Sequence, residues 1–416
     1  MFETTSKTVP VTKEMVREAY RKVKRNQGSA GVDKQSLEDY EADLLNNLYV
    51  LWNRMSSGSY FPKPVRSVSI PKANGKKRVL GIPTVSDRVA QQVVKDYLEP
   101  RLEAQFQAQS YGYRPLKSAH QAVAAVQDNV RRYAWVIDMD IKNFFDEVDH
   151  ELLMKAVERH VPEAWVKMYI RRWLESPVQQ SDGTLIQKEG QGTPQGGVIS
   201  PLLANLFLHY VLDKWLTKRY PEVAFVRYAD DIVVHCQTEA EAKHLLEAIR
   251  LRLVECKLRL SEEKTKMVYC QDYRRPKKKD YGKKFDFLGF TFKPRTIASK
   301  SGGSFVGYGC AISQKAQTRI VDGWKQLKLH RRSDLTIQNI ANQVNSQMRG
   351  VIKYYGKFKL RDLQRLMWRF EFRLAKWALN KYASFKGSYR EAFIWIKDLK
   401  RSYPGMFYYW TIFKHV

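Results

Sequence analysis

The sequence predicts an α+β fold on the basis of three observations. The chain has 416 residues, 44% hydrophobic and 12% aromatic, which is enough for two or three domains with buried cores. Short β-rich segments at 64–83, 134–140, 225–235 and 285–292 are separated by stretches of helical periodicity. These hairpins and helices follow no regular strand–helix–strand order, which favours α+β over a parallel α/β fold.

The first hundred residues are predicted to form helices followed by a hairpin. Residues 12–56 have helical patterning, which the glycines of 26–33 interrupt with a loop. Residues 64–83 alternate around an Asn-Gly pair at 74–75, which is typical of a hairpin tip. A further helix is expected from about residue 85 to residue 98.

The middle of the chain holds two apolar β segments that contain acids. Residues 134–140 form an apolar run that ends in carboxylates, as a buried strand would. Residues 225–235 have β-rich flanks around an Asp-Asp pair, which predicts a hairpin with acids at its turn. Helices are expected at 200–216, where a proline occupies the first turn, and at 239–256.

The C-terminal part is expected to be helical beyond a boundary. Proline and glycines interrupt the pattern at 293–313, so we expect a domain boundary there. Within 361–377, apolar residues recur at helical spacing while arginine recurs every four residues. One face should therefore pack and the adjoining face should present guanidinium groups. The arginines of this row are Arg361, Arg365, Arg369 and Arg373.

The positive charge is large and unevenly placed. The chain has 72 Lys+Arg against 43 Asp+Glu, a formal net charge of +29, and residues 271–416 alone hold 32 basic against 9 acidic residues. A concentrated positive field attracts polyanions, so nucleic acid is the leading partner and an anionic membrane surface the alternative. Aromatic residues interleaved with Lys353 and Lys357 favour nucleic acid, because bases stack on rings.

Cysteine usage and hydropathy predict the compartment. The four cysteines are too widely spaced for a zinc knuckle and too few for a disulfide scaffold, which fits a reducing environment. The N-terminus lacks the layout of a secretory signal, and no apolar stretch of about 18 residues occurs. We therefore expect a cytoplasmic protein without a membrane partner.

Three aspartates are the candidate reactive groups. Asp140 ends one apolar strand, and Asp230 and Asp231 lie at the turn of the second. Carboxylates among apolar residues are costly unless they pair or bind cations, and Mg²⁺ prefers such oxygen ligands. Two such ions about 4 Å apart can activate a primer 3′-hydroxyl and stabilise departing pyrophosphate. The arrangement predicts nucleotidyl transfer, although an Asp-Asp pair alone is often only a turn former.

Seven segments together carry a resemblance to a known family. They are Ile-Pro-Lys at 70–72 with Arg-Val-Leu-Gly-Ile-Pro-Thr at 78–84, Ser-Tyr-Gly-Tyr-Arg-Pro at 110–115, Asp-Met-Asp-Ile-Lys-Asn-Phe-Phe-Asp at 138–146, Gly-Thr-Pro-Gln-Gly-Gly at 192–197 with Ser-Pro-Leu-Leu-Ala-Asn at 200–205, Tyr-Ala-Asp-Asp at 228–231, Phe-Leu-Gly-Phe at 287–290, and Arg-Gly-Val-Ile-Lys-Tyr-Tyr at 349–355. In this order they cover nearly the whole chain. The chain thus resembles the reverse transcriptases, and among them the group II intron-encoded reverse transcriptase/maturases.

The resemblance implies a fold, partners and cofactors. The implied fold is a right-hand polymerase with fingers, palm and thumb, followed by an all-α maturase-like thumb region. Residues 1–60 would be an N-terminal extension, 61–295 the fingers and palm, and 296–416 the helical thumb and maturase RNA-binding domain. The implied partners are an RNA template, a DNA primer, deoxynucleoside triphosphates and group II intron RNA, with two Mg²⁺ ions that Mn²⁺ can replace. No endonuclease module follows the maturase-like region, so second-strand cleavage is not expected.

The resemblance also assigns roles to the matching residues. Asp140, Asp230 and Asp231 resemble the metal triad, and Phe145 resembles the ring that excludes a 2′-hydroxyl, although without the motif it would be a core phenylalanine. The other matches are Lys72 and Arg78 for the triphosphate clamp, Gln195 for the templating pocket, Lys264 for the palm lysine that protonates pyrophosphate, Tyr228, Phe287, Leu288 and Gly289 for the primer end, and Arg361, Arg365, Arg369, Arg373, Lys353 and Lys357 for RNA.

Three functions remain open at this point. The first is an RNA-directed DNA polymerase that also assists splicing and retrohoming of an intron RNA, associated with the nucleoid when it acts on DNA. The second is an RNA-binding splicing cofactor with little polymerase activity. The third is a domesticated stand-alone reverse transcriptase in defence or in spacer acquisition from RNA. The intact aspartates favour an active polymerase, and the oligomeric state stays open.

Overall fold

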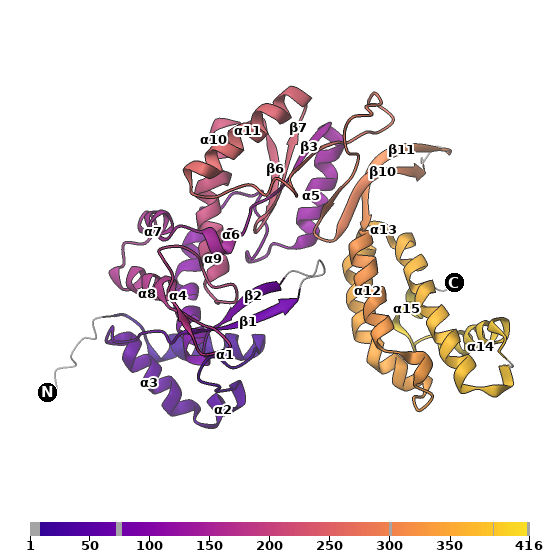
Figure 1. The fold of residues 1–416 in the computed structure, drawn as a ribbon, viewed down its shortest axis with the longest axis horizontal. Coiled ribbons are helices and arrows are strands. Elements are labelled where there is room, and N and C mark those ends of the chain that lie inside the picture. Colours follow the sequence, from indigo (N-terminus) through magenta and orange to yellow (C-terminus); the bar gives the residue numbers. More distant parts are fainter. Residues whose placement is uncertain (1–8, 72–76, 299–301, 386, 414–416) are drawn as a thin grey trace. The chain divides into compact units, whose positions relative to one another are not determined.

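The computed structural model describes residues 9–71, 77–298, 302–385 and 387–413, and Figure 1 traces the chain. It divides into two compact units. The first consists of residues 1–122 and 137–265, and the second of residues 123–136 and 266–416. Helices and short sheets make up the first unit and helices dominate the end of the second, which confirms the predicted α+β class. The scheme of three domains stays a prediction.

Helices form most of the first unit. The buried residues of α1 fall at helical spacing and pack against α3 and α4, and this explains why the segment folds as a helix. The expected loop at 26–33 is confirmed. The helices are α1 (Lys13–Asn26), α2 (Leu37–Ala42), α3 (Leu44–Ser56), α4 (Val85–Glu103), α6 (Phe144–Glu147), α7 (His150–Glu158), α8 (Ala164–Glu175), α9 (Ser200–Leu208), the π-helical turn η1 (His209–Asp213), α10 (Lys214–Arg219) and α11 (Glu239–Glu255).

The hairpin predicted at 64–83 is confirmed. Strands β1 (Val65–Pro71) and β2 (Lys77–Ile82) pair antiparallel, with Ile70 opposite Arg78. Its Asn-Gly tip lies outside the described residues. On its other edge β1 pairs in parallel with β4 (Val178–Gln179), and β4 pairs with β5 (Leu185–Ile186).

The two acid-bearing segments share one sheet. Strands β6 (Ala224–Tyr228) and β7 (Asp231–Cys236) form the predicted antiparallel hairpin, and β7 is the sheet neighbour of β3 (Trp135–Asp140), as Figure 1 shows. Most residues of these strands are buried, as expected for short runs of valine and isoleucine. The strands that carry the candidate aspartates are therefore adjacent.

A long hairpin occupies most of the segment expected to be a domain boundary, 293–313, and that boundary stays a prediction. Strands β10 (Phe290–Ala298) and β11 (Ser304–Ile312) pair antiparallel over their full length. Gly302 and Gly303 have positive φ angles of 89° and 81°, and they serve the connection between the strands. The expected single strand at 285–292 is also divided, because β9 (Phe285–Phe287) turns back onto β10.

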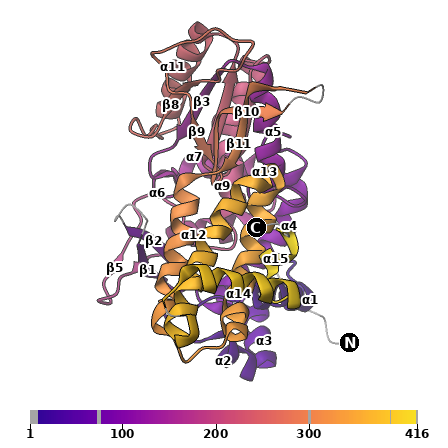
Figure 2. The same ribbon diagram turned by 90° about the vertical axis from the view of Figure 1, so that its right-hand side faces the viewer.

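The second unit ends in the predicted helices. The apolar residues at helical spacing in 361–377 are buried, which confirms the packing face; they are Leu363, Leu366, Met367, Phe370, Leu374 and Trp377. Helices α14 and α15 pack against α13 (Figure 2). An extended residue, Lys359, kinks α13. Along the described chain, no helix combines the length and apolar character needed to cross a membrane. The remaining elements are α5 (Ala119–Arg132), β8 (Lys266–Tyr269), α12 (Gln314–Gln326), η2 (Leu329–Arg331), α13 (Ile337–Lys381), η3 (Ala383–Phe385), α14 (Tyr389–Ser402) and α15 (Tyr408–Ile412).

Candidate active site

The hairpin turn between β6 and β7 presents two of the candidate aspartates. Tyr228 pairs with Asp231, so Ala229 and Asp230 form the connecting turn. Ala229 has a φ of 56°, in the left-handed region that two-residue hairpin turns require and that alanine rarely adopts. Tyr228 and Asp230 are half-buried and Asp231 is exposed. The surrounding structure must hold this turn in place, because the alanine conformation is not favourable by itself.

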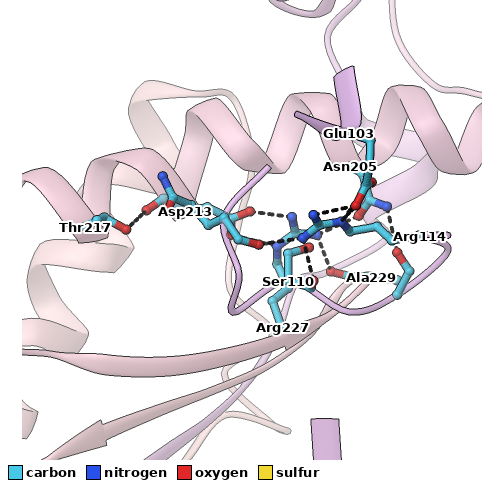
Figure 3. Close-up of polar contacts among 10 residues, drawn as sticks. Glu103, Ser110, Arg114, Asn205, Asp213, Thr217, Arg227 and Ala229 are labelled. Atoms are coloured by element: carbon cyan, nitrogen blue, oxygen red, sulfur yellow. Dashed lines mark hydrogen bonds and ion pairs between the residues drawn. The ribbon is translucent and has the colours of Figure 1, made fainter. Parts of the chain in front are cut away.

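A buried arginine lies next to the turn. Arg227 and Asp213 are both fully buried, and the guanidinium donates to both carboxylate oxygens, with distances of 2.7 Å from Nε and 2.5 Å from Nη2 (Figure 3). Its Nη1 donates to Asn205 Oδ1 at 2.8 Å and to the carbonyl oxygen of Ala229 at 3.1 Å. Because the charge is paired bidentately, it can be kept inside the protein. This network fixes the backbone directly before Asp230.

The segment at 110–115 supports the same turn. A Cβ on Gly112 would clash with the backbone nitrogen of Ala229, so only glycine allows this approach. The carbonyl of Gly112 accepts a 2.7 Å hydrogen bond from the Asn205 amide, and Tyr111 N donates to the Arg227 carbonyl at 2.8 Å. Two of the motif segments therefore converge on the turn as its framework, a role that sequence reasoning did not assign.

A second arginine closes the segment at 110–115. Arg114 is 9% exposed and donates to the Ser110 carbonyl at 2.7 Å and to the Glu103 carboxylate at 2.6 Å. Figure 3 shows it beside the Arg227 network. These bonds tie the segment to α4, so the loop that contacts Ala229 is itself anchored on a helix.

His209, in the π-helical turn that also provides Asp213, is buried. Its side chain is 3% exposed, and burial lowers its pKa to about 4, with a smaller opposing effect from Asp213. The imidazole is therefore neutral near pH 7. The neutral ring leaves Asp213 to pair with Arg227 alone, and π-helical turns of this kind occur frequently at functional sites.

Asp140, at the end of β3, is brought together with Lys264. The chain returns to this strand end, because Ser261 N donates to the Asp140 carbonyl at 2.8 Å and Ile141 bridges to Leu260. Lys264 Nζ then lies 2.6 Å from Asp140 Oδ2. The lysine side chain is 63% exposed and the aspartate side chain 28% exposed, so water screens the pair and it contributes little stability.

Carboxylate oxygens are donors of the kind that a divalent cation prefers. Within the described residues, no group of three or more His, Cys, Asp or Glu side chains could hold a metal ion by itself. Mg²⁺ typically takes one or two carboxylates and completes its shell with phosphate oxygens and water. Asp140 on β3 and Asp231 on the neighbouring β7 supply hard oxygen donors, and Asp140 already accepts the Lys264 ammonium.

Phe145 lies on α6, just after the end of β3. Asn143 adopts a left-handed φ of 41° at the start of this helix, and Thr193 N donates to the Phe145 carbonyl at 2.7 Å. Phe144 is 2% exposed and belongs to the core, whereas Phe145 is only half-buried. The phenylalanine that packs the core is therefore the preceding one, which leaves Phe145 available to contact a ligand.

Gln195 lies on a glycine-rich loop attached to β2. Its carbonyl accepts a 2.8 Å hydrogen bond from Gly81 N, and a Cβ on Gly196 would lie 2.5 Å from the Gly81 carbonyl oxygen. The loop and the strand that contains Arg78 are thus joined through their backbones. Lys72 lies outside the described residues, as does the side chain of Arg78.

Two family models match the chain. Residues 70–292 match the model for reverse transcriptase (RNA-dependent DNA polymerase), which covers more than half of the chain. The chain belongs to the reverse transcriptase family. Residues 317–393 match the group II intron maturase-specific domain, so the family resemblance in the sequence is confirmed. Both matches concern RNA, which confirms nucleic acid as the class of partner.

The chain is also similar to individual proteins. Protein YkfC of Escherichia coli (strain K12) is 36% identical over 283 residues, which is 59% of this chain and 73% of that protein. Group II intron-encoded protein LtrA of Lactococcus lactis subsp. cremoris is 32% identical over 201 residues, 48% of this chain but only 33% of LtrA. A solved telomerase from Candida albicans, in complex with the TWJ fragment of telomeric RNA, aligns over 88% of this chain and 66% of its own, with 12% identity and a TM-score of 0.46.

Three of the four residues predicted to contact the primer end, Phe287, Leu288 and Gly289, form a tight turn in the second unit, whereas Tyr228 ends β6 in the first. Leu288 and Gly289 have φ angles of 48° and 79°, and Phe287 is buried. Tyr354 Oη on α13 donates to the Leu288 carbonyl at 2.9 Å, and a Cβ on Gly289 would lie 2.9 Å from Tyr355 Oη. The turn and α13 line a groove of about 630 Å³. Two tyrosines of α13 therefore hold this turn in place.

The predicted arginine row of the reverse transcriptase is only partly exposed. Arg361, Arg365 and Arg369 are exposed, but Arg373 is half-buried and lines a small cavity beside Trp324. A step of four residues exceeds the 3.6 residues of a helical turn, so the row drifts around the helix until its fourth member meets the core. The predicted RNA-binding lysines at 353 and 357 are exposed.

Proposed function

We propose that this reverse transcriptase extends a DNA primer on an RNA template by metal-dependent nucleotidyl transfer, and that it also binds a group II intron RNA to assist splicing and retrohoming. The observation that carries the proposal is the rigid support beneath the Asp230 turn. The Arg227 network and Gly112 hold a strained two-residue turn next to the strand that ends in Asp140. Such preorganisation is needed by a site where charge develops during reaction.

Asp140, Asp230 and Asp231 would hold the divalent cations, Mg²⁺ or in its place Mn²⁺. When bound, these ions would supply charge stabilisation at the primer 3′-oxygen and at the departing pyrophosphate. Lys264 would donate a proton to pyrophosphate, since its ammonium lies within reach of the Asp140 carboxylate and most of its side chain is exposed. Tyr228 would contact the primer end from the same hairpin.

The other residues would bind and select the nucleotide. Lys72 and Arg78 would hold the triphosphate, and Gln195, on the loop joined to β2, would line the templating pocket. Phe145 would exclude the 2′-hydroxyl. The turn formed by Phe287, Leu288 and Gly289 would grip the primer, and the exposed arginines and lysines of α13 would bind RNA.

RNA-templated primer extension tests this function. A labelled DNA primer annealed to an RNA template should be extended when deoxynucleotides and Mg²⁺ are present, and EDTA should abolish the extension. Tight RNA binding without extension in either Mg²⁺ or Mn²⁺ would instead support a splicing cofactor. Sequencing of RNA that copurifies from the native host would separate an intron partner from a stand-alone role.

Replacing Phe145 with alanine is expected to weaken discrimination against ribonucleotides by about ten- to a hundred-fold, because a pocket wall that rejects one extra group is worth that much. The ratio of kcat/KM for a deoxynucleotide and its ribonucleotide measures the effect. Phe61→Ala is the matched control, since this phenylalanine of the same unit is 67% exposed and lies on another segment, so its loss should leave sugar selectivity unchanged. Unchanged selectivity in Phe145→Ala would remove the steric role.

A further inference from the structure

Three exposed aromatic rings gather on the C-terminal half of α13 and the start of α14. Trp368, Phe372 and Tyr389 are 52%, 43% and 37% exposed. The rings of Phe372 and Tyr389 are stacked with centroids 4.9 Å apart and an interplanar angle of 15°, and Trp368 lies 6.2 Å from Phe372. Six other large apolar residues of this segment are buried: Leu363, Leu366, Met367, Phe370, Leu374 and Trp377. A group of rings left on the surface beside a full core indicates a binding surface.

Exposed arginines share a helix face with Trp368. Arg361, Arg365 and Trp368 follow one another at helical spacings of four and three, so they share a face, and Arg369 adjoins it. All three arginines are exposed. Both acids in this stretch of α13 are occupied elsewhere: Asp362 pairs with Arg295 at 3.2 Å, and Glu371 is 5% exposed. The exposed face of this segment is therefore cationic and aromatic.

We propose that this face binds single-stranded RNA and stacks its unpaired bases on Trp368, Phe372 and Tyr389, while Arg361 and Arg365 hold the phosphates. This inference rests on the proposed function, which includes an RNA partner, and it specifies that the RNA bound at this face is single-stranded. An A-form duplex keeps its bases stacked on each other, so it would leave the faces of the rings unused, whereas looped or terminal nucleotides would cover them. A second copy of the chain is disfavoured by repulsion between two molecules that each have a net charge of +29.

Binding of defined RNAs to the full chain tests the proposal. The probes are an unstructured RNA of twelve nucleotides and an abasic strand with the same number of phosphates, measured by fluorescence anisotropy at several salt concentrations. Saturating blunt RNA–DNA duplex occupies the polymerase cleft during the measurement. The double variant Trp368→Leu/Phe372→Leu should bind the base-containing RNA about ten- to a hundred-fold more weakly and the abasic strand as the wild type does, because stacking alone is lost.

The arginines should give a different signature. Arg361→Gln/Arg365→Gln should weaken binding of both strands and reduce the slope of log affinity against log salt by about 1.4, since each phosphate contact contributes about 0.7 on a single strand. Tyr403→Leu is the matched control, because this ring of the same unit is 59% exposed but lies outside the group. Thermal melting checks that each variant is folded.

Two results would overturn the proposal. The first is wild-type affinity of Trp368→Leu/Phe372→Leu for the base-containing RNA, and the second is an RNA duplex that binds as tightly as the single strand and loses as much affinity in that variant. Primer extension by the wild-type chain is measured in parallel. An inactive wild type that still shows the stacking signature would reject the polymerase function and leave this inference standing.

Discussion

Replacing Asp230 with asparagine is expected to lower the rate of RNA-templated primer extension by about a thousand-fold or more. The substitution keeps the size and hydrogen-bonding shape of the side chain but removes its charge, and a catalytic metal is worth several kcal/mol, with each 1.4 kcal/mol a factor of ten in rate. The fold should be retained, because the carbonyl of Ala229 keeps its hydrogen bond from the Arg227 guanidinium in this variant. Single-turnover extension at saturating primer–template measures the rate.

The matched control for this variant is Asp182→Asn. Asp182 is an exposed acid on a loop of the same unit, so its change alters the net charge equally without touching the hairpin turn. It should extend primers as the wild type does. If Asp230→Asn also extended primers at the wild-type rate, the aspartates would have no part in the chemistry.

The acid-bearing strands could be predicted because their signals are local. Residues 134–140 and 225–235 are short segments rich in β-branched side chains, and they end or turn at aspartates. The strand structure of each can therefore be predicted from its own residues. The resemblance to a metal triad implied that the two segments come together, and the structure places β3 and β7 side by side in one sheet. The helices of residues 12–56 and 361–377 were predictable for the same reason, since their periodicity is contained within one element.

The hairpin of β10 and β11 could not be predicted in this way. In a local pattern, glycines and a proline at 293–313 indicate a break in regular structure. Here Pro294 instead pairs with Tyr308 inside a sheet, and two glycines form part of the connection between the strands. Pairing between distant residues, which no local pattern contains, decides the outcome. The burial of Arg373 could not be predicted for a similar reason, because only the packed helix shows where the row of arginines meets the core.

Arg227 is the functional residue that sequence reasoning missed. The only signal was a charged residue inside an otherwise apolar strand, Phe-Val-Arg-Tyr at 225–228, which a buried position makes costly unless a partner is supplied. That partner, Asp213, comes from a π-helical turn whose register is not visible in the sequence. The segments at 110–115 and 200–205 belong to the same framework. Their role is to hold the turn at Ala229, and it does not require direct contact with substrate.

The variant Arg227→Met is expected to lower the free energy of unfolding by about 3–5 kcal/mol, because it leaves the Asp213 carboxylate buried and without its bidentate partner. Urea unfolding measures this loss. The exposed pair Arg401 and Asp398 gives the control, since its side chains are 69% and 60% exposed and Arg401→Met should change stability by less than about 1 kcal/mol.

The double variant Arg227→Met/Asp213→Leu separates the fold from the function of this network. Replacing a buried ion pair by apolar residues of similar volume is often neutral for stability, so the double variant should recover most of what Arg227→Met loses. Its kcat for primer extension should nevertheless remain about a hundred-fold low with little change in KM for the primer–template, because the Ala229 carbonyl has lost the donor that fixes the turn before Asp230. Recovery of both stability and kcat would mean that Arg227 serves the core alone, whereas recovery of stability without kcat would identify it as the residue that positions the aspartate.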